Sequence, residues 1–205
     1  MAGPSLTTDV LVLANRPPAD TFQTFTVFSA EHGPLFVLHR IAKKNTVGTL
    51  ALDLFDEVTL GLETANQGQT WFVKEARLIT RHAGLGASYE TLQAASALAR
   101  LLARNTVHEE SRAKVYQLFR EALAALAGTS RPDIVHLKSL YRFARDEGYP
   151  IKEHWFPALP AAEREAVATL LNQPVAGQTT EPVFVAKLLR RLEDYLRGHT
   201  EILLD

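Results

Sequence analysis

The period of the hydrophobic pattern changes near residue 83, and this change divides the chain into two kinds of structure. Before it, apolar and polar residues alternate, and β-branched and aromatic side chains are frequent, which is typical of strands. After it, apolar residues recur at the three- and four-residue spacing of amphipathic helices. The sequence therefore predicts an α+β chain, with a β domain at 1–83 and a helical domain at 84–205.

The first part of the chain predicts five strands, because turn-forming residues interrupt the alternating pattern four times. The expected strands span 8–13, 22–28, 35–40, 52–60 and 71–80. Five strands within about 80 residues are typical of a small closed barrel, and the five-stranded OB-fold is a common barrel of this kind that binds oligonucleotides. An SH3-like barrel has almost the same pattern and stays open as an alternative.

The second part predicts helices at 88–104, 109–127 and 132–147, a short helix at about 161–171, and a last one from 182 to about 197. Thr106 and Glu109 have the spacing of a capping box, which places the start of the second helix there. The segment 149–160 has no period. Its aromatic pair, Trp155 and Phe156, is expected to be buried by the helices.

No motif in the chain supplies an active site. The absence of cysteine excludes disulfides, thiolate metal sites and cysteine nucleophiles. The seven histidines show no metal-ligand spacing, and the serines lack a Gly-x-Ser-x-Gly turn. The Gly-rich segment 84–89 lacks the third glycine and the following strand of a dinucleotide loop. We therefore expect no catalytic residue, no metal and no cofactor. No apolar run approaches the roughly 20 residues that span a bilayer, so no membrane partner is expected either.

The formal net charge of −1 argues against a strongly basic nucleic-acid binder, so an anion-binding surface requires local clustering of cations. Such clusters occur near the end of the second hairpin strand and along the last strand. In a regular strand Lys74 and Arg77 fall on opposite faces, whereas Arg77 and Arg81 share one. A solvated rim is the alternative. The candidate DNA-binding residues are Arg16, His39 (when protonated), Arg40, Lys43, Lys44, Lys74, Arg77 and Arg81.

Several short segments, taken in chain order, resemble the RecO family of bacterial recombination mediators. They are Arg16-Pro17, Asp20-Thr21 and 27–33 in the first hairpin, 54–58 and 74–76 in the later strands, and 140–150 and 189–196 in the helical half. Two features depart from the family pattern. The basic Lys-Gly-Ala-Arg turn of the family is replaced by 39–42 followed by Lys43-Lys44, and the four-cysteine zinc module of many members is missing.

The resemblance implies an N-terminal OB-fold that binds single- and double-stranded DNA, and a helical C-terminal domain. Such proteins anneal complementary strands and, with RecR, load recombinase onto DNA coated by single-strand-binding protein, whose acidic tail they contact. They use no nucleotide and act in the bacterial cytoplasm at the nucleoid.

The resemblance also implies a site for that acidic tail on the helical half. Lys138, Arg142 and Arg145 are spaced four and three residues apart, so they share one helical face and are the candidate partner-binding residues. A solvated stripe paired with Asp146 and Glu147 is the alternative. The competing function for the whole chain is a protein-interaction module on the same fold, with weak or no DNA binding.

Overall fold

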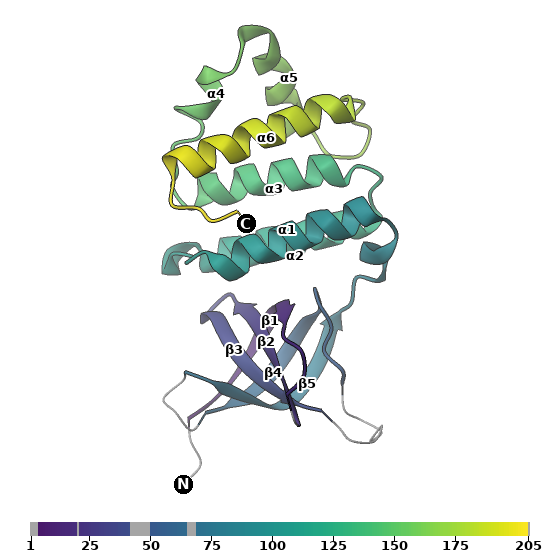
Figure 1. Cartoon of the computed structure of the whole chain (residues 1–205), viewed down its shortest axis with the longest axis vertical. Coiled ribbons are helices and arrows are strands. Elements are labelled where there is room, and N and C mark those ends of the chain that lie inside the picture. Colours follow the sequence, from purple (N-terminus) through teal and green to yellow (C-terminus); the bar gives the residue numbers. More distant parts are fainter. Residues whose placement is uncertain (1–3, 20, 42–49, 65–68, 205) are drawn as a thin grey trace.

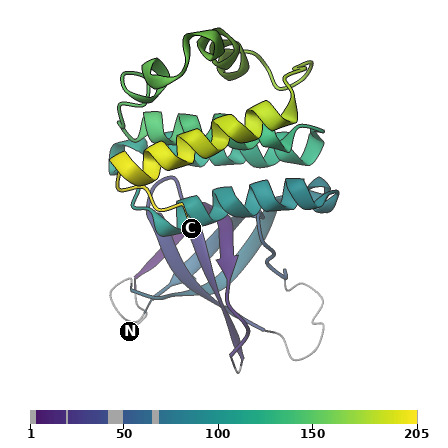
Figure 2. The same cartoon turned by 45° about the horizontal axis from the view of Figure 1, so that its top comes forward.

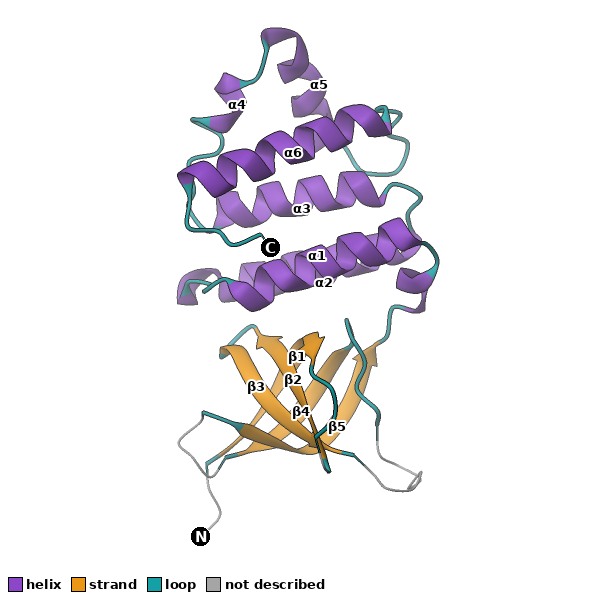
Figure 3. Cartoon of the chain, in the orientation of Figure 1, coloured by secondary structure: helices purple, strands orange, loops and turns teal. Residues whose placement is uncertain are grey.

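The computed structural model describes residues 4–19, 21–41, 50–64 and 69–204, and it confirms the α+β class: strands come first and helices follow (Figure 3). The strands are β1 (Ser5–Asn15), β2 (Phe22–Ser29), β3 (Gly33–Arg40), β4 (Glu57–Glu63) and β5 (Trp71–Thr80). Gly33, at the β2–β3 turn, has a φ of 70°, a conformation that favours glycine.

The five strands close into a barrel in the order β1-β2-β3-β5-β4, with β4 pairing back to β1. Strands β3 and β5 pair in parallel, and the other neighbours are antiparallel. The interior is filled by apolar residues contributed by every strand and by Leu52. The closing contact between β3 and β5 is short, with two residue pairs, Val37 with Trp71 and Leu38 with Phe72.

The fourth strand begins later than expected. Residues 52–60 were predicted as one strand, but the chain turns at 53–56 and the strand starts at Glu57. The carboxylate of Asp56 accepts a hydrogen bond from the Asp53 amide at 2.9 Å, and Phe55 has a φ of 68°. Leu52 and Phe55 are buried although they lie outside any strand. Their apolar side chains gave residues 52–56 the sequence pattern of a strand, but the burial comes from packing against other elements.

The helices are stacked in layers beyond one end of the barrel (Figures 1 and 2). Helices α1 (Tyr89–Arg104) and α2 (Arg112–Gly128) lie next to the barrel, α3 (Pro132–Asp146) and α6 (Pro182–His199) lie above them, and α4 (Trp155–Ala158) and α5 (Ala161–Asn172) lie outermost. Two 3-10 turns, η1 (Ala83–Gly86) and η2 (Glu109–Ser111), precede α1 and α2. Among the described helices, none is long and apolar enough to cross a bilayer.

The predicted capping box at Thr106 and Glu109 is wrong. Glu109 begins η2, and α2 starts only at Arg112. The η2 turn is instead capped by a carboxylate from the end of α3. Glu147 accepts hydrogen bonds from the His108 amide at 3.2 Å and from the Ser111 hydroxyl. The local pattern could not reveal this long-range partner. Trp155 is buried as expected and Phe156 is half-buried.

Helix α1 begins where the sequence places it, at the cap Ser88. The Ser88 hydroxyl accepts a hydrogen bond from the Thr91 amide at 3.1 Å. We expect Ser88→Ala to lower the free energy of unfolding by about 1 kcal/mol, because one amide of the first turn loses its partner. Urea denaturation of the two proteins measures this difference. Equal urea midpoints would show that the cap contributes nothing.

One end of the barrel is packed under α1 and α2. Leu11, Leu13 and Phe28 point out of the barrel at this end and join the apolar cluster of the helices. A polar contact crosses the same junction: the buried Glu57 carboxylate accepts a hydrogen bond from the Tyr116 hydroxyl at 3.0 Å, and burial raises the pKa of Tyr116. The end of the barrel opposite α1 and α2 therefore lies outside the helical stack (Figure 1).

Candidate nucleic-acid interface

The outward-facing residues of β2 and β3 form the most distinctive surface of the barrel. Alternate residues point inward, and Phe25, Val27 and Val37 fill the core. The residues between them therefore point outward, among them Phe36 and Leu38 on β3. The parallel pairing of β3 with β5 places Phe72 beside Leu38. We define the aromatic wall as Phe22, Phe36, Leu38, Arg40 and Phe72.

The side chains of the aromatic wall differ in their exposure to solvent. Phe36 is 51% exposed, whereas the other apolar members are half-buried. The rings of Phe22 and Phe72 meet edge-on, with centroids 5.8 Å apart. One exposed aromatic residue needs no explanation by itself, but here it shares the wall with two half-buried aromatic residues, which together form an apolar patch. Aromatic side chains on a barrel wall are the groups on which nucleic-acid bases stack.

Two of the predicted cations lie at this wall. Arg40 is exposed and sits opposite Phe22 in the β2–β3 ladder. Arg16 is also exposed, and its amide donates to the Thr24 carbonyl at 2.9 Å, so it borders β2. Neither side chain has an acidic partner among the residues that the structure describes, and arginine is a residue type that commonly contacts phosphate. Lys43 and Lys44 lie outside the described residues.

His39 does not belong to this surface, contrary to expectation. His39 lies two residues after the buried Val37, on the same face of β3, and its ring packs against Phe25 with centroids 6.4 Å apart. Burial lowers the pKa of His39, which disfavours the positive charge that a phosphate contact would need. Period-two alternation already separates His39 from Arg40, because adjacent residues of a strand point to opposite faces.

The two cations Lys74 and Arg77 of β5 differ in their ion pairing. A bulge between Val73 and Glu75 adds a residue to the strand, so Lys74 and Arg77 are both exposed rather than on opposite faces. Lys74 pairs with Glu63 at 3.0 Å. Arg77, opposite Thr59, has no acidic partner in the described part of the chain. Of these two cations, Arg77 is the better candidate for a phosphate contact.

Arg81 holds a buried carboxylate inside the protein. Its Nε and Nη2 donate to the two carboxylate oxygens of Asp56 at 2.8 and 2.5 Å, and Nη2 also donates to the Ala51 carbonyl at 2.9 Å. Asp56 is 1% exposed. The hydrogen bonds to Asp56 raise the pKa of Arg81. The geometry therefore gives Arg81 a structural role that the sequence did not reveal.

The three candidate partner-binding cations on α3 are each placed against a group of the chain itself. Lys138 donates to the Leu170 carbonyl at 3.3 Å and to the Gln173 carbonyl. Arg142 pairs with Glu121 of α2 at 3.2 Å, and Arg145 pairs with Asp146 at 2.7 Å. The three cations predicted to share one helical face therefore each contact a different group of the protein itself. The alternative, a stripe paired with Asp146 and Glu147, is met in part: Arg145 pairs with Asp146, whereas Glu147 binds the η2 turn.

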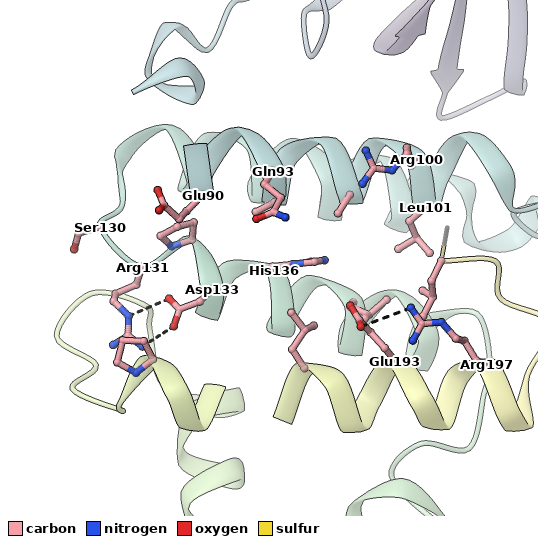
Figure 4. Close-up of a pocket in the computed structure, with 17 residues that line it drawn as sticks. Glu90, Gln93, Arg100, Leu101, Ser130, Arg131, Asp133, His136, Glu193 and Arg197 are labelled. Carbon is pink, nitrogen blue, oxygen red and sulfur yellow. Dashed lines mark hydrogen bonds and ion pairs between the residues drawn. The ribbon is translucent and has the colours of Figure 1, made fainter. Parts of the chain in front are cut away.

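A polar cavity of about 490 Å³ lies between α1, α3 and α6 (Figure 4). Ion pairs stand at its two ends: Arg131 with Asp133 at 2.8 Å, and Arg197 with Glu193 at 3.8 Å. His136 projects from α3 between them (Figure 4). Burial, with a smaller contribution from the positive charge of Arg100, lowers the pKa of His136 to about 4. Within the described residues, no group of three or more potential ligands could hold a metal ion.

The neutral state of His136 predicts a pH dependence of stability. Its folded-state pKa of about 4 lies below the ordinary 6.5, so the unfolded chain binds more protons between these values. The contribution of neutral His136 to the free energy of unfolding is therefore fully present above pH 6.5. It is lost as the pH falls toward 4, by about 1–2 kcal/mol at pH 5. His136→Gln should reduce this loss. Urea midpoints of both proteins at pH 7 and pH 5 measure it, and equal pH slopes would contradict the assignment.

Sequence reasoning missed the aromatic wall. One signal was present: residues 35–38 are four consecutive apolar residues in an antiparallel hairpin, which makes both faces of β3 apolar. The position of Phe72 had no local signal, since it depends on the β3–β5 pairing. No family model and no curated protein matches the chain, so its function is inferred from its own residues.

Proposed function

We propose that the barrel is an OB-fold and that single-stranded nucleic acid binds across its aromatic wall. The strand order, in which β1 pairs with both β2 and β4 and β3 is parallel to β5, supports an OB-fold over the SH3-like alternative. In OB-folds the face of strands 2 and 3 and the neighbouring loops bind oligonucleotides. The single observation that carries the proposal is the coincidence on that face of exposed Phe36, the Phe22–Phe72 pair and Arg40, which has no acidic partner among the described residues.

The resemblance to the RecO family extends this proposal to a biological role. We infer a non-enzymatic mediator of DNA repair and recombination in the bacterial cytoplasm. It binds single- and double-stranded DNA, promotes annealing, and acts with RecR and the acidic tail of single-strand-binding protein. A stacking wall suits this role, because stacking tolerates any base sequence and breaks no covalent bond.

A fluorescent deoxythymidine oligonucleotide of about 20 nucleotides tests the binding proposal, since this length exceeds the usual site of one OB-fold. Fluorescence anisotropy measures its affinity across a salt series. We expect the logarithm of the affinity to fall linearly with the logarithm of salt concentration, by about 0.7 per phosphate contact on a single strand. The alternative, a protein-interaction module, predicts no binding or a flat salt response.

Arg40 should account for part of the salt response. We expect Arg40→Glu to weaken oligonucleotide binding several-fold and to reduce the salt slope by about 0.7, because one phosphate contact is lost. The matched control is Arg190→Glu, which reverses the charge of an exposed arginine on α6 with no acidic partner among the described residues. If both variants lose the same affinity, the effect reflects net charge and Arg40 does not contact the strand.

A further inference from the structure

A second surface, on the junction between barrel and helices, continues the aromatic wall. A groove of about 200 Å³ lies between the end of β1, the turn before β4 and one face of α1. Its floor is apolar and includes Leu13, Leu54 and Phe55. Its polar groups are the Asn15 side chain from β1, and Ser96 and Arg100 from α1. The groove thus combines an apolar floor with hydrogen-bonding groups and one cation.

The groove is adjacent to the aromatic wall through the strand pairing. Ala14, which lines the groove, pairs with Thr26 of β2, and Thr26 pairs with Phe36 of β3. Neighbouring strands lie roughly 5 Å apart, so two steps across the ladder span roughly 10 Å. A strand of nucleic acid stacked on Phe36 therefore reaches the groove within a few nucleotides.

The cations of α1 on this side are suited to phosphate. Ser96, Arg100 and Arg104 are each four residues apart, so they follow one face of the helix. Arg100 and Arg104 are exposed, and neither has an acidic partner among the residues described. An arginine without a carboxylate partner retains all its donors for a phosphate oxygen.

We propose that single-stranded nucleic acid leaves the aromatic wall over Thr26 and Ala14 and enters the groove under α1, where Arg100 binds a phosphate. This inference rests on the proposed function, because it extends the path of the same strand. It makes the helical domain part of the nucleic-acid site, and it predicts that longer strands gain contacts that short strands cannot make.

Strand length separates the groove from the wall. We compare deoxythymidine oligonucleotides of about 4 and about 20 nucleotides, which lie at the lower limit of an OB-fold site and above its upper limit. Arg100→Glu should weaken binding of the long strand several-fold, reduce its salt slope by about 0.7 and leave the short strand unchanged. Phe36→Ala should weaken both lengths. Arg190→Glu is again the control for charge.

A cross-linking experiment gives a reading that does not depend on the stability of the arginine variant. Because the chain has no cysteine, Ser96→Cys provides one thiol in the groove for a photoactivatable benzophenone. We expect it to cross-link the long strand and not the short one, whereas the same label at Ala186→Cys on α6 should cross-link neither.

The outcomes distinguish the path from the proposed function. If Arg100→Glu matches Arg190→Glu on the long strand and Ser96→Cys gives no more cross-link than Ala186→Cys, the path is wrong. In that case loss of binding in Phe36→Ala still supports the wall. If the unmodified protein binds neither length, the proposed function fails and the path fails with it.

Discussion

Replacing Phe36 and Phe72 together with alanine is expected to weaken binding of a single-stranded oligonucleotide by about 30-fold or more. Each ring provides a surface on which a base can stack, and such stacking contributes roughly 1–3 kcal/mol per base. Phe36 is more than half exposed and Phe72 is half-buried at the start of β5, so both truncations leave the barrel interior intact. Fluorescence anisotropy at constant salt measures the loss.

The control for the double variant is Tyr89→Ala. Tyr89 is the most exposed aromatic residue of those described, at 73%, but it begins α1 and lies off the aromatic wall. We expect its removal to leave the affinity unchanged. If the double variant retains full affinity, the bases do not stack on this wall. If Tyr89→Ala causes the same loss, the binding is a general property of exposed aromatic groups.

The largest expected effect on stability comes from Arg81→Ala. This change leaves the Asp56 carboxylate buried without its bidentate partner. Removing one member of a buried ion pair costs more than the pair contributes, because the remaining charge is uncompensated. We expect a loss of about 3 kcal/mol in the free energy of unfolding, the low end of the range for buried pairs, because the Arg81 side chain is 43% exposed. Urea denaturation measures it.

Arg77→Ala is the matched control for Arg81→Ala. Arg77 lies on the same strand, is exposed and has no acidic partner among the described residues, so its removal should change stability by less than about 0.5 kcal/mol. It should instead reduce the salt slope of oligonucleotide binding if β5 borders the strand. A stable Arg81→Ala protein with weakened DNA binding would reverse these two roles and return Arg81 to the nucleic-acid surface.

Local patterns determined much of the architecture. Period-two alternation placed β2, β3 and β5 within a residue or two of their ends, and the helical period located α1, α3 and α6 nearly as well. Such patterns record which face of a segment is buried, and that property is local. They failed where burial came from elsewhere. Leu52 and Phe55 are covered by other elements rather than by a strand neighbour, and the start of α2 is held by Glu147 from the end of α3.

The sequence by itself determined which residue types could bind nucleic acid, and only the tertiary structure decided which of them are available. Arg81 and Arg142 are held by Asp56 and Glu121, carboxylates 25 and 21 residues away along the chain. Phe72 joins the aromatic wall because β5 pairs in parallel with β3. Ion pairing and outward clustering depend on distances between segments that meet only when the barrel closes and the helices pack against its end. A pattern that reports the burial of single residues contains no record of those distances.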